Sequence, residues 1–423
     1  MSKKRLSLPF KSTALKAFAG VLGLILLASA PIFAQTRTTG VENVARQRIS
    51  INNNWSFYKY VSADKADNLI YDVRPEATED TDHKVADAKP TEAVEVAATA
   101  QVLKPWILPT GNDFIKDPAK RHTRPEGSPG ADFPFVQADF DDSSWERVNL
   151  PHDWAIKGPF LEGPDAEVGG SMGRLPSPGV AWYRKDLDIP ASDAGKSIFL
   201  DVDGAMSYAI VWLNGHLVGG WPYGYSSWRL DLTPYLNPGG ENQLAIRLDN
   251  PTVSSRWYPG GGIYRNVWLT KTNPVHVSQW GTDVTTKEVS KAFAIVDLEV
   301  SIDNDSGKDP NVEAITQVFA LDKDGKKTGK AVASFKLMKT GVAAGERVRL
   351  KGSVTIKNPR LWGPPPTQTP HRYLAVTTLR QQGKPVDTYE TPFGIRDLRF
   401  DPETGLYVNG ERIYIKVLTS TMI

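Results

Sequence analysis

Short stretches of alternating apolar and polar residues run through most of this 423-residue chain, and turn residues separate them. A period of two over a few residues is typical of strands with one buried face. Asn214-Gly215 predicts a two-residue hairpin, because both residues tolerate positive φ. From Phe140 to Thr270 this pattern therefore predicts a β-sandwich or jelly roll. Its expected strands are VAWYRKDLDI, KSIFLDVDGA, YAIVWLNGHLVGG, WRLDLTPYL, NQLAIRLDN and YRNVWLTK.

A second all-β unit is expected from Pro274 to about Asp397, and its strand count fits an immunoglobulin-like sandwich. Leu361 to Pro370 (LWGPPPTQTP) is not expected to form an interior strand, because proline cannot donate to a ladder. The expected strands are VHVSQWGTDVTT, AIVDLEVSID, EAITQVFALD, KAVASFKLM, RVRLKGSVTI and RYLAVTTLR.

The region before Phe140 is less regular. Ile49 to Val61 has the alternation of a first strand. Residues 62–138 are rich in Ala, Pro, Asp and Glu, with one short helix expected from Thr91 to Leu103. This segment is interpreted as a partly ordered insertion on the first sandwich, and a disordered linker is the alternative.

The amino terminus has the form of a secretory signal peptide. Basic residues from Lys3 to Lys16 precede an apolar run from Ala17 to Ala30, and cleavage is expected after Ala34. An uncleaved anchor is the alternative, but the run is short for a span of roughly 20 apolar residues. We therefore expect a secreted or periplasmic protein with no membrane association after cleavage.

Charge and composition narrow the classes of partner and cofactor. Fifty Lys and Arg against 48 Asp and Glu give no field that would attract nucleic acid. The chain has no cysteine, so disulfides and thiolate metal sites are excluded. Its six histidines form no H-x-H or H-E-x-x-H pattern, and we expect neither a metal site nor a cofactor.

Several motifs together resemble the amino-terminal region of glycoside hydrolase family 2, which includes β-galactosidases, β-glucuronidases and β-mannosidases. Their order and spacing agree with that family, and PHDW with SRWYPGGGIYR leans toward β-galactosidase-like members. The motifs are LPHDW (Leu150 to Trp154), WYRK (Trp182 to Lys185), VWLNG (Val211 to Gly215), GYSSW (Gly224 to Trp228), DLTPY (Asp231 to Tyr235), SRWYPGGGIYR (Ser255 to Arg265) and FGIR (Phe393 to Arg396).

The resemblance implies an all-β architecture followed by a catalytic barrel. Residues 35–273 would form a sugar-binding jelly roll with its insertion, and residues 274–396 an immunoglobulin-like sandwich. Residues 397–423 would be the stub of a (β/α)₈ barrel, a fold that needs roughly 200 or more residues. The sequence departs from the family pattern after Lys416, and we expect a frameshift, premature stop or assembly break there.

Most motif residues are interpreted as structural. Asp153 follows a proline and is placed to bond backbone amides of a turn. Trp154, Trp182 and Trp212 are expected in the sandwich core. The other residues assigned to structural motifs are His152, Gly260, Gly262 and Arg265.

The glycine-rich loop is the candidate for substrate contact. Gly260 to Gly262 allow a tight excursion between two strands, which can present an aromatic face and a guanidinium to a sugar. The resemblance implies that this loop reaches the edge of the active site. Arg256, Trp257 and Tyr258 are therefore the substrate-edge candidates, and an interface salt bridge is the alternative role of Arg256.

No catalytic residue is assigned to this chain. Glycoside cleavage ordinarily needs two facing carboxyl groups. Asp201 with Asp203, and Asp141 with Asp142, are the local pairs, but each reads as part of a turn or cap. The resemblance implies that both catalytic residues are glutamates of the barrel.

We expect the non-catalytic portion of a secreted, retaining, β-galactosidase-like enzyme, inactive alone, whose substrate is a β-galactoside or related neutral glycan. A stand-alone carbohydrate-binding protein is the main alternative. A third possibility is assembly with a separately encoded barrel, which would require a large apolar interface.

Overall fold

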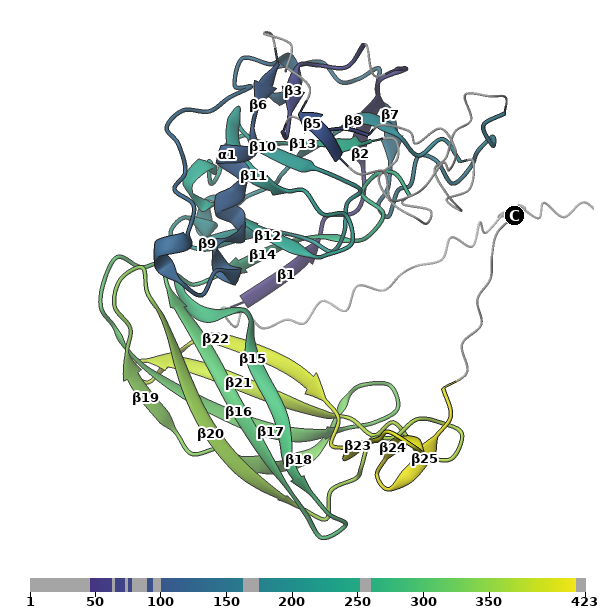
Figure 1. Ribbon diagram of the computed structural model, residues 1–423. Helices are drawn as coiled ribbons and strands as arrows, with labels where there is room; N and C mark the ends of the chain where they lie inside the picture. The colour runs from purple at the N-terminus through teal and green to yellow at the C-terminus, as the bar shows by residue number, and fades with distance from the viewer. Residues whose placement is uncertain are drawn as a thin grey trace, which may run out of the picture. The chain divides into compact units, whose positions relative to one another are not determined.

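The computed structural model describes residues 46–62, 65–72, 75–77, 90–93, 100–162, 175–251 and 260–415 (Figure 1). The expected signal peptide and the sequence after Ile415 lie outside these residues. Strands dominate the described part of the chain, so the prediction of an all-β protein is confirmed. Within it, no helix has the length and apolar character needed to cross a bilayer.

Residues 46–272 form the N-terminal sandwich, in which two antiparallel sheets enclose a core. The four-stranded sheet has the order β1-β14-β9-β12, and the six-stranded sheet has the order β11-β10-β13-β8-β2-β7. Their bounds are β1 Arg46–Ser50, β2 Trp55–Lys59, β7 Glu146–Val148, β8 Gly179–Asp186, β9 Ser197–Val202, β10 Ala209–Leu213, β11 His216–Trp221, β12 Trp228–Asp231, β13 Gln243–Asn250 and β14 Val267–Thr272, with 3₁₀ turns η5 Ala191–Asp193 and η6 Thr233–Tyr235.

Two local predictions have opposite outcomes in this sandwich. Asn214 and Gly215 have φ of 51° and 77° and join β10 to β11, which confirms the hairpin. The single strand expected over Ile49 to Val61 is wrong. Asn54, at φ 58°, lies in a turn that sends β1 and β2 into different sheets.

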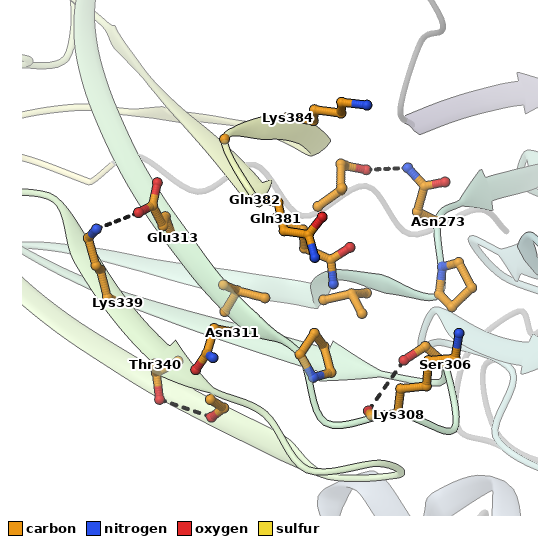
Figure 2. Close-up of a pocket in the computed structure, with 17 residues that line it drawn as sticks. Asn273, Ser306, Lys308, Asn311, Glu313, Lys339, Thr340, Gln381, Gln382 and Lys384 are labelled. Carbon is orange, nitrogen blue, oxygen red and sulfur yellow. Dashed lines mark hydrogen bonds and ion pairs between the residues drawn. The ribbon is translucent and has the colours of Figure 1, made fainter.

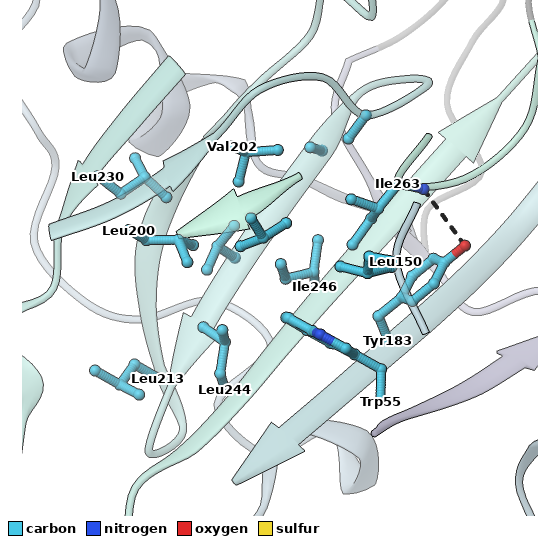
Figure 3. Packing of buried hydrophobic residues seen from close by; sticks show 14 of the residues in the cluster. Trp55, Leu150, Tyr183, Leu200, Val202, Leu213, Leu230, Leu244, Ile246 and Ile263 are labelled. Carbon is cyan, nitrogen blue, oxygen red and sulfur yellow. Dashed lines mark hydrogen bonds between the residues drawn. The ribbon is translucent and has the colours of Figure 1, made fainter. Parts of the chain in front are cut away.

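The core between the two sheets is dominated by aliphatic residues with a few large aromatic rings (Figure 3). Alternate residues of β8 and β10 point into it, among them Tyr183, Val211 and Leu213. The residues between them, Trp182 and Trp212, are buried on the opposite face of the six-stranded sheet. Their expected place in the sandwich core is therefore wrong, because the period of two puts neighbours on opposite faces.

The insertion covers that opposite face. Its described elements are β3 Leu69–Ile70, β4 Pro75–Ala77, β5 Pro90–Ala93, β6 Gln101–Val102, α1 Lys104–Ile107, η2 Leu108–Phe114, η3 Pro118–Lys120 and η4 Pro134–Val136. Leu69, Leu103 and Ile107 pack with Trp182 and Trp212 in a second core. The prediction of a helix from Thr91 to Leu103 is wrong for the described residues of this range, because strand β5 lies at its start and strand β6 near its end.

Residues 275–393 form the C-terminal sandwich, whose sheets have the orders β15-β16-β20 and β18-β17-β21-β22, with β19 pairing β17. Burial alternates residue by residue along β16, as expected for a strand with one face in a core. The bounds are β15 Val275–Val289, β16 Phe293–Asn304, β17 Asn311–Leu321, β18 Lys327–Ser334, β19 Met338–Gly341, β20 Arg347–Lys357, β21 Tyr373–Gln381 and β22 Lys384–Phe393.

Two further segments complete the described fold. Residues 361–370 form no strand beyond an isolated bridge between Trp362 and Pro370, as the prolines predict. A three-stranded sheet follows, with β23 Leu398–Asp401, β24 Gly405–Val408 and β25 Glu411–Ile413.

Candidate functional site

The PHDW and GGGIYR motifs form one structural unit. His152 donates its backbone N–H to Ile263 O at 2.8 Å, and Trp154 donates to Gly261 O at 2.9 Å. On the other side, Met206 and Gly262 exchange backbone hydrogen bonds of 2.9 and 3.2 Å. We call residues 150–155 and 260–265 the motif junction.

Close packing explains the glycines of the motif junction. A Cβ atom at Gly261 would lie 2.5 Å from the Trp154 ring. Gly262 has φ of +111°, and a Cβ there would lie 2.5 Å from the Tyr183 hydroxyl. Only glycine combines this backbone conformation with so little space.

Asp153 and Trp154 brace the turn that brings the two motifs together. One carboxylate oxygen of Asp153 accepts from the backbone N–H groups of Ala155 at 2.9 Å and Gly261 at 3.2 Å. The Trp154 indole N–H donates to Ser177 O at 3.0 Å, and its ring stacks on Phe57. Both side chains thus make contacts that hold the loop's shape.

His152 is held as a neutral, packed side chain. Its Nδ1 lies 2.8 Å from the hydroxyl of Tyr183, and its ring makes an edge contact with Phe57. Burial lowers the pKa of His152 and raises that of Tyr183 well above its usual value. The Tyr183 hydroxyl also accepts from Ile263 N–H at 3.4 Å (Figure 3), so this pair ties the junction to β8.

The three substrate-edge candidates, Arg256, Trp257 and Tyr258, lie outside the described residues. The described chain on either side of their segment is fixed by the buried Asn250. Its side-chain amide donates to Gly260 O at 2.7 Å and to Ser177 O at 2.9 Å. We call this arrangement the Asn250 clasp. It anchors the residues that flank 252–259 to the motif junction.

The structure places Gly260 in the clasp and Arg265 on the surface beyond it. Arg265 is exposed. A Cβ atom at Gly204 would lie 2.8 Å from Cδ of the Arg265 side chain. Arg265 therefore packs against the Asp203-Gly204 turn.

The aspartate pairs considered for catalysis are bound within the fold. Asp201 receives two hydrogen bonds from Arg229, at 2.5 and 2.8 Å, and one from Thr270 at 2.6 Å. Asp203 accepts from the Trp268 indole at 3.0 Å. Both carboxylates are therefore engaged in contacts within the N-terminal sandwich.

The second pair has the same character. Asp142 lies between two guanidinium groups, 2.9 Å from Arg184 Nε and 3.2 Å from Arg147 Nη2. Hydrogen bonds from Ser143 lower the pKa of Asp141. Both aspartates are therefore engaged by neighbouring groups of the fold.

A cavity of about 940 Å³ opens in the C-terminal sandwich (Figure 2). Amides and lysines line it, including Gln381, Gln382 and Lys384, and Lys339 is paired with Glu313 at 2.5 Å. None of the described residues that line it is aromatic. The cavity therefore offers no ring on which the apolar face of a sugar could stack.

Sequence reasoning missed the roles of three buried side chains that organise this region. Asn250 forms the clasp, Tyr183 binds His152, and Asp67 of the insertion pairs with Arg247 at 2.8 Å. The partners of Asp67 and Asn250 lie far away in the sequence or in a loop. For Asn250, the sequence signal is its place directly before Pro251 at the end of an expected strand.

Comparison with known proteins places both sandwiches in one family. Residues 178–257 match the domain family described as glycosyl hydrolase 2 galactose-binding domain-like, and residues 275–396 match the family glycosyl hydrolases family 2. These matches have the order and approximate positions of the two β-domains.

Individual relatives give the same result. The chain is 39% identical over 281 residues to a β-galactosidase, BoGH2A, of Bacteroides ovatus, covering 66% of this chain and 32% of that protein. It is 30% identical over 295 residues to a β-glucuronidase of Formosa agariphila, covering 65% of this chain and 29% of that protein. The chain thus spans about a third of the length of these relatives.

A solved structure of a family 2 glycosyl hydrolase from Bacteroides cellulosilyticus is also similar. Its TM-score is 0.59 at 31% identity, and the match covers 70% of this chain and 36% of that one.

Proposed function

Because this chain belongs to glycoside hydrolase family 2, whose two amino-terminal β-domains it carries, we propose that it is the non-catalytic part of an enzyme that hydrolyses O-glycosidic bonds. A β-galactoside or a related neutral glycan is the proposed substrate. The contacts that engage Asp141, Asp142, Asp201 and Asp203 within the fold support the proposal that the chain is inactive alone. The resemblance assigns both catalytic glutamates to a barrel.

The Asn250 clasp is the observation that carries the proposed role in substrate binding. It fixes the flanks of the segment with Arg256, Trp257 and Tyr258 to a rigid junction of two motifs. A binding loop on a rigid scaffold loses less conformational entropy when it meets its ligand. We infer that this loop borders the sugar site of the complete enzyme.

Exposed apolar side chains support a further domain as partner. Ile156 and Phe160 lie in the loop after Trp154, Phe400 lies on β23, and Tyr414 directly follows β25, and all four are more than half exposed. Such side chains mark interaction surfaces when they gather on a soluble domain. We propose that a catalytic barrel covers them, and that radical footprinting of Phe400 weakens when a barrel is joined.

A chimera tests the substrate role. The matched region of the Bacteroides ovatus β-galactosidase would be replaced by this chain, and hydrolysis of an aryl β-galactoside measured. Arg256→Ala and Trp257→Ala should each raise KM by roughly tenfold or more, because one charge-assisted hydrogen bond or buried aromatic contact is lost. Arg265→Ala is the matched control, and we expect its KM to stay within about twofold.

Loss of the effect would contradict the proposal. If an active chimera keeps its KM when Arg256, Trp257 and Tyr258 are all replaced by alanine, the loop does not border the sugar.

We also propose export to the periplasm or the exterior, on the basis of the basic and apolar amino-terminal residues. The expected mature protein begins at Gln35, and amino-terminal mass spectrometry of the exported protein measures this directly. An intact Met1 on protein that remains in the cytoplasm would refute export.

A further inference from the structure

The insertion and the edges of both sheets of the N-terminal sandwich enclose a cavity of about 350 Å³, which we call the edge groove. The insertion contributes α1 and η2, while the sandwich contributes β11 from one sheet and β12 from the other. Its volume lies within the range of small-molecule sites, ~300–1,000 Å³. The edge groove lies outside the motif junction and uses none of its residues.

The insertion is fitted closely onto β11. Gly219 leaves room for η2, because a Cβ there would lie 2.7 Å from Thr110 Oγ1, whereas a Cβ at Gly220 would meet the backbone of β10 at Ala209 O. Arg124 holds the same contact by donating to Val218 O at 3.0 Å and Trp106 O at 3.3 Å. The groove is thus a built feature of the fold, with its walls fixed by backbone contacts.

Aromatic rings form much of the groove's lining. Phe114 and Trp221 meet edge to face with centroids 5.8 Å apart, and Phe114 is 61% exposed. The other aromatic residues of the lining are Trp106, Phe199, Trp228 and Tyr235. Flat rings that remain accessible in a concave site suit the apolar C–H face of a pyranose ring.

Two indole N–H groups of this lining have no acceptor among the described residues. Trp228 is only 2% exposed, and its Nε1 is buried without a partner. The Nε1 of Trp106 is in the same state. Buried donors are nearly always satisfied, because an unmade hydrogen bond costs free energy. Because both residues line the groove, their indole N–H signals should report on its occupancy.

The charges of the lining are balanced and largely used within the protein. The lining contains two acidic residues, Asp113 and Asp231, and two basic residues, Arg124 and Arg229. Arg229 is bound by Asp201 at 2.5 Å, and Arg124 donates to backbone carbonyls. This leaves no excess charge for an anionic or cationic ligand.

We propose that the edge groove is a second carbohydrate site, which binds a neutral pyranoside against the exposed ring of Phe114 beside Trp221. This goes beyond the proposed function, because it needs neither a barrel nor the loop at 252–259.

The test is a titration of the full chain with β-1,4-galactobiose and, in parallel, cellobiose, followed by ¹H–¹⁵N NMR of the indole groups. At least one disaccharide should bind and shift the Trp106 and Trp228 Nε1–H signals, assigned with Trp→Phe variants. Phe114→Ala should weaken binding by at least about tenfold. Phe160→Ala is the matched control, because Phe160 is 62% exposed and lies outside the groove, and its affinity should be unchanged.

Each other outcome overturns the proposal. Saturable binding that survives Phe114→Ala but is lost in Arg256→Ala places the sugar at the glycine-rich loop, which supports the proposed function instead. Absence of binding of either disaccharide at tens of millimolar leaves the groove without the assigned ligand class. Indole shifts of the same size with a simple polyol such as glycerol indicate non-specific polyol binding and no carbohydrate site.

Discussion

Replacing Asp67 by alanine is expected to destabilise the protein by about 3–5 kcal/mol, because it removes the carboxylate to which the buried Arg247 is hydrogen-bonded. The two side chains are 0% and 1% exposed, and Asp67 also accepts from the Trp182 indole at 2.9 Å. Asp249 lies 3.6 Å from Arg247 Nη1, too far for a hydrogen bond. Denaturant unfolding, followed by tryptophan fluorescence, measures the loss.

The insertion offers a matched control for this substitution. Asp72 pairs with Lys104, but both side chains are about one-third or more exposed. Asp72→Ala should cost no more than about 1 kcal/mol. In the double variant Asp67→Leu/Arg247→Met we expect part of the stability to return, since apolar residues can replace a buried pair. Equal losses for Asp67→Ala and Asp72→Ala would show that the buried pair does not hold the insertion.

Gly262→Ala is expected to destabilise the motif junction by about 2–6 kcal/mol, the combined cost of an unfavourable backbone conformation and overpacking. Its φ is +111°, and the added methyl group would press on the Tyr183 hydroxyl and on the carbonyl of His152 at 2.6 Å. Thermal unfolding measures the effect, and hydrogen exchange at Ile263 shows whether the damage is local.

Gly307 provides the comparison at another positive-φ position. Its φ is +65°, and nothing lies within 4 Å of an added Cβ, so Gly307→Ala should cost only about 1 kcal/mol. If the two substitutions cost the same, close packing around Gly262 is not what requires glycine there.

The sequence predicted the parts of the fold that depend on local pattern. The Asn214-Gly215 hairpin and the proline-rich break at Leu361 to Pro370 follow from the backbone preferences of single residues. The alternation of β16 likewise reveals a strand with one face in a core. These features need no knowledge of distant partners, which is why a single sequence was enough.

The errors have a common physical cause in long-range packing. Trp182 and Trp212 were expected between the sheets, yet the insertion creates a second core on the other face. A strand's alternation shows that two faces differ, but not which one is covered by another segment. The break between β1 and β2 was missed because it depends on the positive φ of Asn54, which the alternation of apolar and polar residues does not reveal.

The motifs pointed to residues of the motif junction, but not to the contacts that build it, and the role of the substrate-edge candidates stays a prediction. The motifs indicated His152, Asp153, Gly260 and Gly262, whose contacts form the motif junction. The Asn250 clasp, however, joins Ser177 and Gly260 across two separate segments. The edge groove was not predictable, because it forms only where Trp106 and Phe114 of the insertion meet rings of the sandwich that are distant in the sequence.

The most direct test of the central claim is hydrolysis of an aryl β-galactoside by the purified chain alone. We predict no release of the aryl group above the no-protein rate at any protein concentration, because the candidate carboxylates are bound within the fold. A rate that rises in proportion to protein concentration, and that falls when Asp201 or Asp142 is replaced by asparagine, would contradict the account.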